Sequence, residues 1–183
     1  VKAGSTQVEW YNYGEKKWAN AVTVSNPASY TNAEPGTPVS DITGFFVWIP
    51  RYEYDYSNMA NCHGSGDRDV PNAININFKS GTDTTETTGY IVHPVFRNGN
   101  VSSYTNNAYT TTSAYQMGGW DKELTGFWFG KFETTGSSTT PTVLPLASPL
   151  TNENISTQYT TAQKIKTNNS LLLDSHMAKN DTT

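Results

Sequence analysis

Three blocks rich in aromatic residues, separated by polar stretches, constrain the fold of this 183-residue chain most strongly. They lie at residues 8–24, 42–56 and 120–135. Each aromatic side chain buries a large area, so a few such blocks can support a core. The intervening stretches are rich in Thr, which favours strands, and in Asn and Ser, which favour turns. The pattern predicts short strands joined by many turns and argues against wholesale disorder.

The second block gives the clearest strand signal. Residues 45–49 form a continuous apolar run, typical of a strand buried on both faces, and Pro50 is expected to end or bend it. Residues 51–56 then alternate charged residues with tyrosines, which predicts a half-exposed strand. Further strands are expected within 73–78, 90–96 and 126–133, a linker-like loop at 136–150, and a helical face within 157–166.

The first block has the signature of a β-hairpin, because two aromatic runs flank Gly14-Glu15-Lys16. Trp10 and Trp18 lie on opposite sides of this turn and are expected to pair across it. We therefore expect a hairpin at 1–24, a Pro/Gly connector at 25–40 and a main domain at 41–183, with insertions at about 57–72 and 97–119.

Charge and cysteine content exclude several classes of protein. The net charge is −4 and the basic residues are scattered, which argues against a nucleic-acid partner. No apolar run approaches the roughly 18 residues of a membrane span. A single cysteine, Cys62, excludes an internal disulfide and a multi-cysteine metal site. The sequence begins without Met, so we expect a fragment or a mature product.

Two strings resemble a known family. Phe46-Val47-Trp48-Ile49-Pro50 resembles the opening strand of the formylglycine-generating-enzyme-like (sulfatase-modifying factor) domain. His93-Pro94, followed by residues 126–135 (GFWFGKFETT), resembles that family's second signature. The chain also resembles bacterial surface and prophage proteins that carry these strings, over roughly residues 10–183. The resemblance implies an α+β, mostly β fold: an incomplete C-type-lectin-like domain, truncated at its C-terminus and preceded by the β-hairpin.

The same resemblance implies a non-catalytic, extracellular ligand-binding or adhesion module of a bacterial surface or phage protein, with a host or cell-surface protein or glycan as its partner. A structural module of a virion fibre or cell-surface stalk is the alternative. A formylglycine-generating-type oxidase is less favoured, because that copper chemistry needs paired cysteines and Cys62 is single.

Residues 97–119 are the expected contact loop. Tyrosine offers contact area at low entropy cost, while Ser and Asn adapt their hydrogen bonds to a ligand. The loop is equally consistent with a disordered insertion. The candidate ligand-binding residues are Tyr104, Asn106, Asn107, Tyr109 and Tyr115.

Other chemically suggestive residues are expected to be structural. The segment that contains Cys62, His63, Asp67 and Asp69 is expected to be a solvated polar loop, because the spacing of these residues does not suit zinc. The alternative is a calcium ion held by Asp67, Asp69 and loop carbonyls. His93, inside an apolar strand, is expected to be at least half-buried, with its ring bonded to a backbone carbonyl.

Glu53 and Glu133 are the carboxylates that a glycosidase would need as a pair. Each lies in an alternating strand. Both are therefore expected to face solvent or to pair with Arg51 or Lys131 across the sheet.

Overall fold

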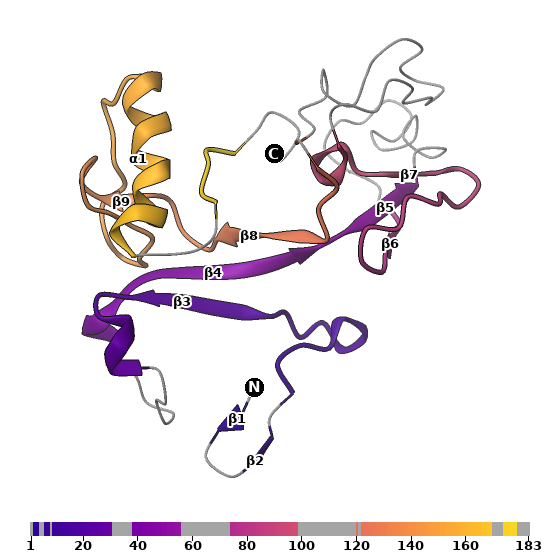
Figure 1. Ribbon diagram of the computed structural model, residues 1–183, viewed down its shortest axis with the longest axis horizontal. Helices are drawn as coiled ribbons and strands as arrows, with labels where there is room; N and C mark the ends of the chain where they lie inside the picture. Colours follow the sequence, from indigo (N-terminus) through magenta and orange to yellow (C-terminus); the bar gives the residue numbers. More distant parts are fainter. Residues whose placement is uncertain are drawn as a thin grey trace, which may run out of the picture. The chain divides into compact units, whose positions relative to one another are not determined.

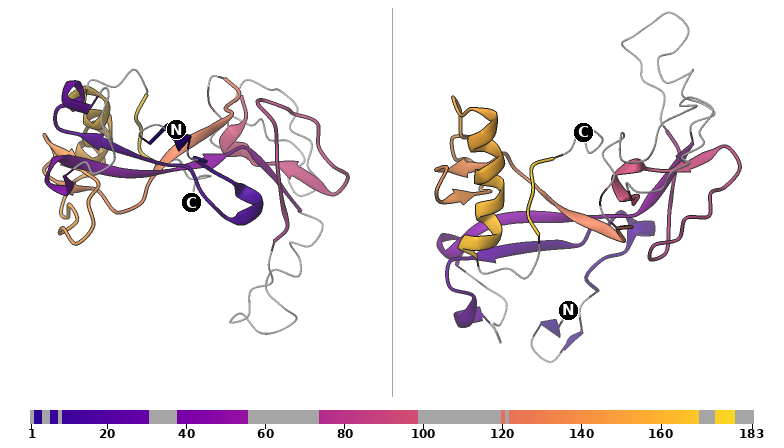
Figure 2. Two further views of the ribbon diagram at one scale, coloured as in Figure 1. Left: turned by 90° about the horizontal axis from the view of Figure 1, so that it is seen from below. Right: turned by 45° about the horizontal axis from the view of Figure 1, so that its top comes forward.

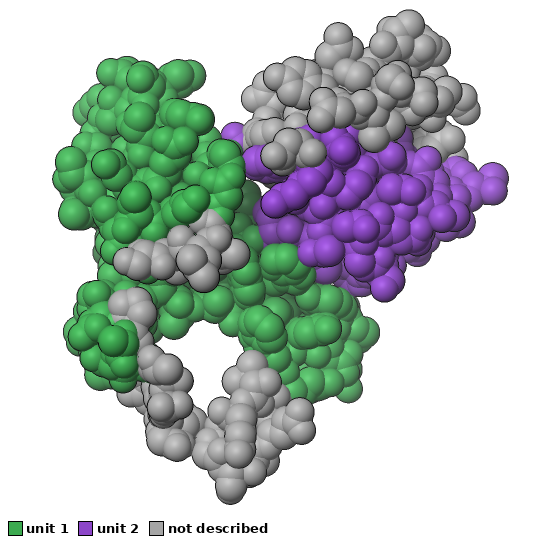
Figure 3. Space-filling model, in the orientation of Figure 1, with its two compact units in different colours: residues 1–48, 128–177 green, residues 49–127, 178–183 purple. Residues whose placement is uncertain are grey.

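The computed structural model describes residues 2–3, 6–7, 9–30, 38–55, 74–98, 120, 122–169 and 174–178. The chain divides into two compact units (Figure 3). Unit 1 comprises residues 1–48 and 128–177, and unit 2 comprises residues 49–127 and 178–183. Within the described ranges the protein is mostly β with one α-helix, which confirms the predicted mostly β, α+β class.

A three-stranded sheet organises unit 1 (Figure 1). Its order is β3 (Asn20–Val24), β4 (Ile42–Pro50) and β8 (Gly126–Gly130). Strand β4 is built from β-branched and aromatic residues, which favour extended backbone, and it ends at the predicted Pro50. Strand β3 pairs antiparallel with β4 and places Val22 opposite Phe45.

Gly44 in β4 allows its neighbours to approach closely. A Cβ atom at this position would lie 2.7 Å from the ring of Phe46 and 2.8 Å from Oγ1 of Thr23. On the other side of the strand, Val143 forms a parallel bridge with Gly44, and its amide donates a 3.0 Å hydrogen bond to the carbonyl of Thr43. The centre of unit 1 therefore depends on a residue without a side chain.

Helix α1 (Ile155–Asn168) lies beside a small hairpin in unit 1 (Figures 1 and 2). Asn154 caps the helix by accepting a 2.9 Å hydrogen bond from the amide of Thr157. The helix contains the helical face predicted within 157–166. The hairpin, β9 (Thr135–Gly136) with β10 (Pro141–Thr142), lies largely within residues 136–150, which the sequence predicts as a linker-like loop.

Within the first aromatic block, residues 12–17 form a tight turn ahead of β3. Asn12 and Lys17 exchange two 2.8 Å backbone hydrogen bonds around the 3₁₀ turn η1 (Tyr13–Glu15). Ahead of it, β1 (Lys2–Ala3) pairs with β2 (Thr6–Gln7). The predicted connector contains two short 3₁₀ turns, η2 (Pro27–Tyr30) and η3 (Val39–Asp41).

A second three-stranded sheet organises unit 2, with β5 (Tyr52–Asp55) between β6 (Ile76–Phe78) and β7 (Tyr90–Val92). Both pairings are antiparallel. The 3₁₀ turn η6 (Pro94–Phe96) follows β7. The core of the unit contains the buried Val92, Val95 and Phe96, packed against Ile49, Tyr52, Leu124 and Phe127.

The burial of residues 51–55 alternates as predicted, but the charged face points inward. Arg51 and Glu53 have exposed fractions of 0% and 1%, Asp55 is buried, and Tyr52 and Tyr54 are half-buried. The expectation that Glu53 faces solvent or pairs with Arg51 is therefore wrong. Hydrogen-bond partners contributed by later segments, which the local sequence does not reveal, make this burial tolerable.

No helix in the described segments has the length and apolar character needed to cross a membrane.

Candidate functional site

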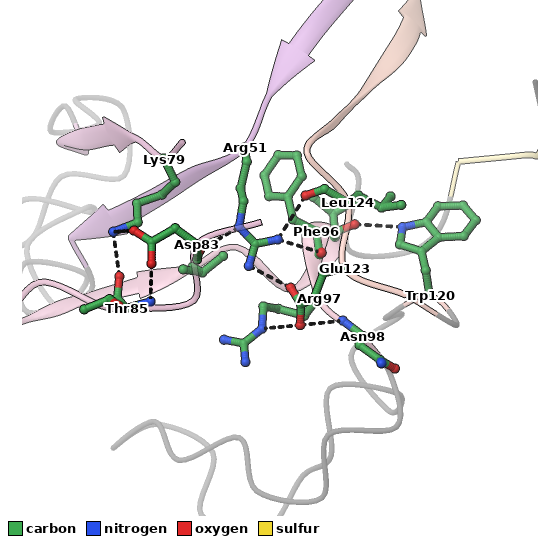
Figure 4. Close-up of polar contacts among 12 residues, drawn as sticks. Arg51, Lys79, Asp83, Thr85, Phe96, Arg97, Asn98, Trp120, Glu123 and Leu124 are labelled. Carbon is green, nitrogen blue, oxygen red and sulfur yellow. Dashed lines mark hydrogen bonds and ion pairs between the residues drawn. The ribbon is translucent and has the colours of Figure 1, made fainter. Parts of the chain in front are cut away.

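A buried charge cluster surrounds Arg51 in unit 2 (Figure 4). The guanidinium donates to the backbone carbonyls of Asp83 and Phe96 at 2.9 Å and of Leu124 at 3.0 Å. It also donates to Oε2 of Glu123 at 2.7 Å. Several N–H groups of Arg51 are thus bound to fixed acceptors, as a buried arginine requires.

Glu123 serves as an acceptor at the centre of this cluster. Its Oε1 accepts hydrogen bonds from Nε of Arg97 at 3.2 Å and from the amide of Asn98 at 3.0 Å. Burial opposes ionisation of Glu123, but these bonds and the two arginine charges outweigh it, so its pKa lies below the ordinary value. Asn98 in turn forms a parallel bridge with Trp120.

Glu53 is held in a similar way on β5. It accepts hydrogen bonds from the hydroxyl of Thr87 at 2.5 Å, from the amide of Thr87 at 3.0 Å and from Nδ2 of Asn77 at 3.1 Å. The ammonium of Lys79 lies 3.7 Å away. Burial works against the charged form, yet these bonds and the lysine keep the pKa of Glu53 below its ordinary value.

These two carboxylates have the environment of structural groups. A general acid or base works best with a pKa near the operating pH, whereas both carboxyl pKa values are lowered. Glu133, the other predicted carboxylate, is exposed in unit 1, as expected. The charged cluster therefore joins segments of unit 2.

His93 follows β7 and is half-buried, which confirms the prediction. The rings of Tyr52 and Tyr54 lie 5.3 and 5.5 Å from the imidazole. Its Nδ1 accepts a 3.3 Å hydrogen bond from the amide of Val95, so the ring bonds an amide and not the expected carbonyl. Desolvation lowers the pKa of His93 to about 4, which leaves the imidazole neutral at pH 7.

Unit 1 contains a different candidate, a continuous series of six aromatic rings that we call the aromatic row. Successive ring centroids are 5.4, 4.9, 6.4, 5.9 and 5.2 Å apart. From one end to the other, the row consists of Trp18, Tyr13, Tyr11, Trp10, Trp128 and Trp48.

Much of the aromatic row is open to solvent. The exposed fractions of Trp10, Tyr11 and Trp18 are 45%, 51% and 40%. The indole N–H of Trp10 donates a 3.0 Å hydrogen bond to the carbonyl of Asn20, which fixes the ring without covering it. Contiguous exposed apolar side chains of this kind mark interaction surfaces.

The turn that presents these rings is held in place. In addition to the paired backbone bonds between Asn12 and Lys17, Oδ1 of Asn12 accepts a 3.2 Å hydrogen bond from the amide of Glu15. Lys16 closes the turn in the left-handed region at φ 59°. A fixed turn reduces the entropy that ordering the surface would cost on binding.

Polar side chains border the aromatic row. The ammonium of Lys17 lies 3.7 Å from a carboxylate oxygen of Glu9 and 2.5 Å from one of Glu15. Nδ2 of Asn12 donates a 3.2 Å hydrogen bond to Glu9. These polar side chains, which belong to the same turn as the rings, include both acceptors and donors.

Sequence reasoning missed this site because it assigned aromatic residues near strands to the core. Trp10 was expected to pair with Trp18. Instead, Trp10 packs on Trp128 and Trp18 packs on Tyr13. The usable signal was the position of Trp10 and Tyr11 just before a glycine-containing turn, where side chains are less readily buried.

The predicted contact residues, and the polar loop considered as an alternative calcium site, lie outside the described residues. This applies to Tyr104, Asn106, Asn107, Tyr109 and Tyr115, and to Cys62, His63, Asp67 and Asp69.

Among the side chains that the structure describes, no group of three or more His, Cys, Asp or Glu is placed to hold a metal ion. No protein-family model matches the chain, and no match was found among curated proteins or solved structures.

Proposed function

We propose that this chain is a non-catalytic ligand-binding or adhesion module of an extracellular bacterial-surface or phage protein, and that it binds through the aromatic row. One observation carries the proposal: Trp10, Tyr11 and Trp18 are large rings, exposed by 40–51%, within one contiguous cluster on a hydrogen-bonded turn. Tyr and Trp are the residues most often enriched at binding hot spots.

The buried charges support a binding role over catalysis. The buried charged side chains of unit 2 form hydrogen bonds to neighbouring segments, and Arg51 alone donates four of them. A rigid scaffold that carries exposed side chains is a common arrangement for recognition.

A C-type-lectin-like fold is part of the proposal. Its support is the resemblance of the strings that form β4 and β8 and of the His93-Pro94 pair, which lies directly after β7. The mostly β architecture with α1 is compatible with such a fold.

The test measures binding of the intact chain to bacterial and host cell surfaces. Trp10→Ala and Tyr11→Ala should each weaken binding about tenfold or more, because truncation of a hot-spot ring commonly costs over 1.4 kcal/mol. Tyr159→Ala is the matched control, since Tyr159 is a 48% exposed aromatic residue on α1. Equal binding by the unaltered chain and by all three variants would reject the aromatic row as the binding surface.

A structural module of a fibre or stalk is the second candidate, and strand β6 favours it. Ile74, Ile76 and Phe78 are exposed on or beside this strand, which lies at the edge of its sheet in the described segments. Apolar edge strands pair readily with other chains. Light scattering should then detect a stable oligomer that Ile76→Lys disrupts; a monomer would remove this candidate.

A further inference from the structure

We infer that the ligand of the aromatic row is a neutral oligosaccharide or polysaccharide chain. This inference rests on the proposed function and specifies the ligand class of that same site. It draws on the chemistry of the rings, the charges along the border and the spacing within the row.

The exposed members of the row are all Trp or Tyr. Such amphipathic rings pack against the C–H faces of pyranose rings and remain compatible with water.

The border of the row suits hydroxyl groups, each of which both donates and accepts hydrogen bonds. Carboxylates of Glu9 and Glu15 accept, while the ammonium of Lys17 and the amide of Asn12 donate. Their existing mutual contacts are made by exposed side chains, which can exchange partners with a bound sugar at small cost.

The charges along this border favour a neutral ligand. Within the turn at residues 9–18, Glu9 and Glu15 both lie within 4 Å of Lys17, and Lys16 adds a second exposed cation, so the four charges of the turn cancel. Recognition of sulfate, phosphate or carboxylate groups typically uses arginine forks. The turn at residues 9–18 contains no arginine.

The spacing within the row favours a chain of sugars over a single one. The exposed Trp10 and Tyr11 are neighbours with centroids 6.4 Å apart, and the exposed Trp18 lies beyond Tyr13, so only a ligand of several units is long enough to reach all three rings. Affinity should therefore rise with chain length, because each added contact comes from a ligand that is already held.

The experiment titrates the intact chain with neutral hexasaccharides of glucose, galactose and N-acetylglucosamine, and with the monosaccharides. A sulfated hexasaccharide serves as the charged comparison. We expect at least one neutral hexasaccharide to bind, at least tenfold more tightly than its monosaccharide. Trp10→Ala and Tyr11→Ala should weaken this binding about 10- to 30-fold, while Tyr159→Ala should leave it unchanged. Circular dichroism melts confirm that each variant is folded.

Three results would overturn the inference: binding of the sulfated hexasaccharide alone, no oligosaccharide binding, or equal loss in the Tyr159 control. Competition by neutral hexasaccharides for cell binding distinguishes the carbohydrate assignment from the proposed function, which is cell binding through the aromatic row. If Trp10→Ala abolishes cell binding but neutral hexasaccharides do not compete, the carbohydrate assignment fails and the proposed function stands. If cell binding does not depend on Trp10, both fail.

Discussion

Nη2 of Arg51 donates a 2.7 Å hydrogen bond to Oε2 of Glu123, a residue 72 positions later in the chain. Arg51 is fully buried between β4 and β5, and it also binds three backbone carbonyls. The pair therefore connects the start of the unit 2 sheet to the segment that precedes β8. Removing one member of a buried pair is costly because the other charge remains buried without its partner.

Arg51→Ala should lower the free energy of unfolding by about 3–5 kcal/mol, the usual cost of breaking a buried pair. Chemical denaturation measures the effect. Lys131→Ala is the control, because Lys131 is an exposed cation bonded to Asn20, and its loss should cost less than about 1 kcal/mol. Similar values for the two variants would mean that the cluster around Arg51 does not stabilise unit 2.

Glu53→Ala should lower the free energy of unfolding by about 1.5–3 kcal/mol, because donors on Thr87 and Asn77 lose a charged acceptor. Glu133→Ala compares the same substitution at an exposed carboxylate, where a change within about 0.5 kcal/mol is expected. Thermal melts of the unaltered protein and both variants at pH 7 compare the two losses of stability. A larger loss at Glu133 would contradict the burial of Glu53.

Acid should destabilise the protein in two stages. The pKa of His93 falls from 6.5 to about 4 on folding, so the unfolded chain takes up a proton first, and stability is lost as pH falls from about 6.5 to about 4. The carboxyl pKa values of Glu53 and Glu123 are also lowered, so their contribution is present above about pH 4.5 and is lost as pH falls through their folded values.

The first stage can be isolated with His93→Asn, which keeps a side-chain acceptor for the amide of Val95 but does not titrate. Its melting temperature should change less between pH 6.5 and 4.5 than that of the unaltered protein. An identical pH dependence in the two proteins would show that His93 is not the titrating group.

Gly136→Ala should destabilise the β9–β10 hairpin more than Gly81→Ala destabilises its turn. Both glycines have positive φ angles, 81° and 53°, where a side chain costs about 1–2 kcal/mol. A Cβ at Gly136 would also lie 2.5 Å from the carbonyl oxygen of Thr140, whereas nothing lies within 4 Å at Gly81. Melting temperatures measure the difference, and a greater loss at Gly81 would count against the hairpin geometry.

Local pattern predicted the strands well but not which face of them is buried. The apolar run before Pro50 became β4, and the helical spacing near Tyr159 became α1, because these signals depend on neighbouring residues. The inward position of Glu53 depends on Asn77 and Thr87, which only the fold brings close.

The partner of each ring in the aromatic row also depends on the fold. Trp10 and Trp128 have ring centroids 5.9 Å apart although they lie far apart in the chain, and β8, which contains Trp128, lies in the same sheet as β3. Sequence spacing alone favoured Trp18 as the partner of Trp10. Exposure of these rings is a tertiary property that aromatic content cannot predict.

Oxidative footprinting of the chain while it is bound to its target cells tests the central claim most directly. Labelling of Trp10, Tyr11 and Trp18 should fall on binding, while Tyr159, equally open in the free protein, should label as before. Unchanged labelling at the three row residues, with protection at Tyr159, would place the contact surface on α1 and contradict the account.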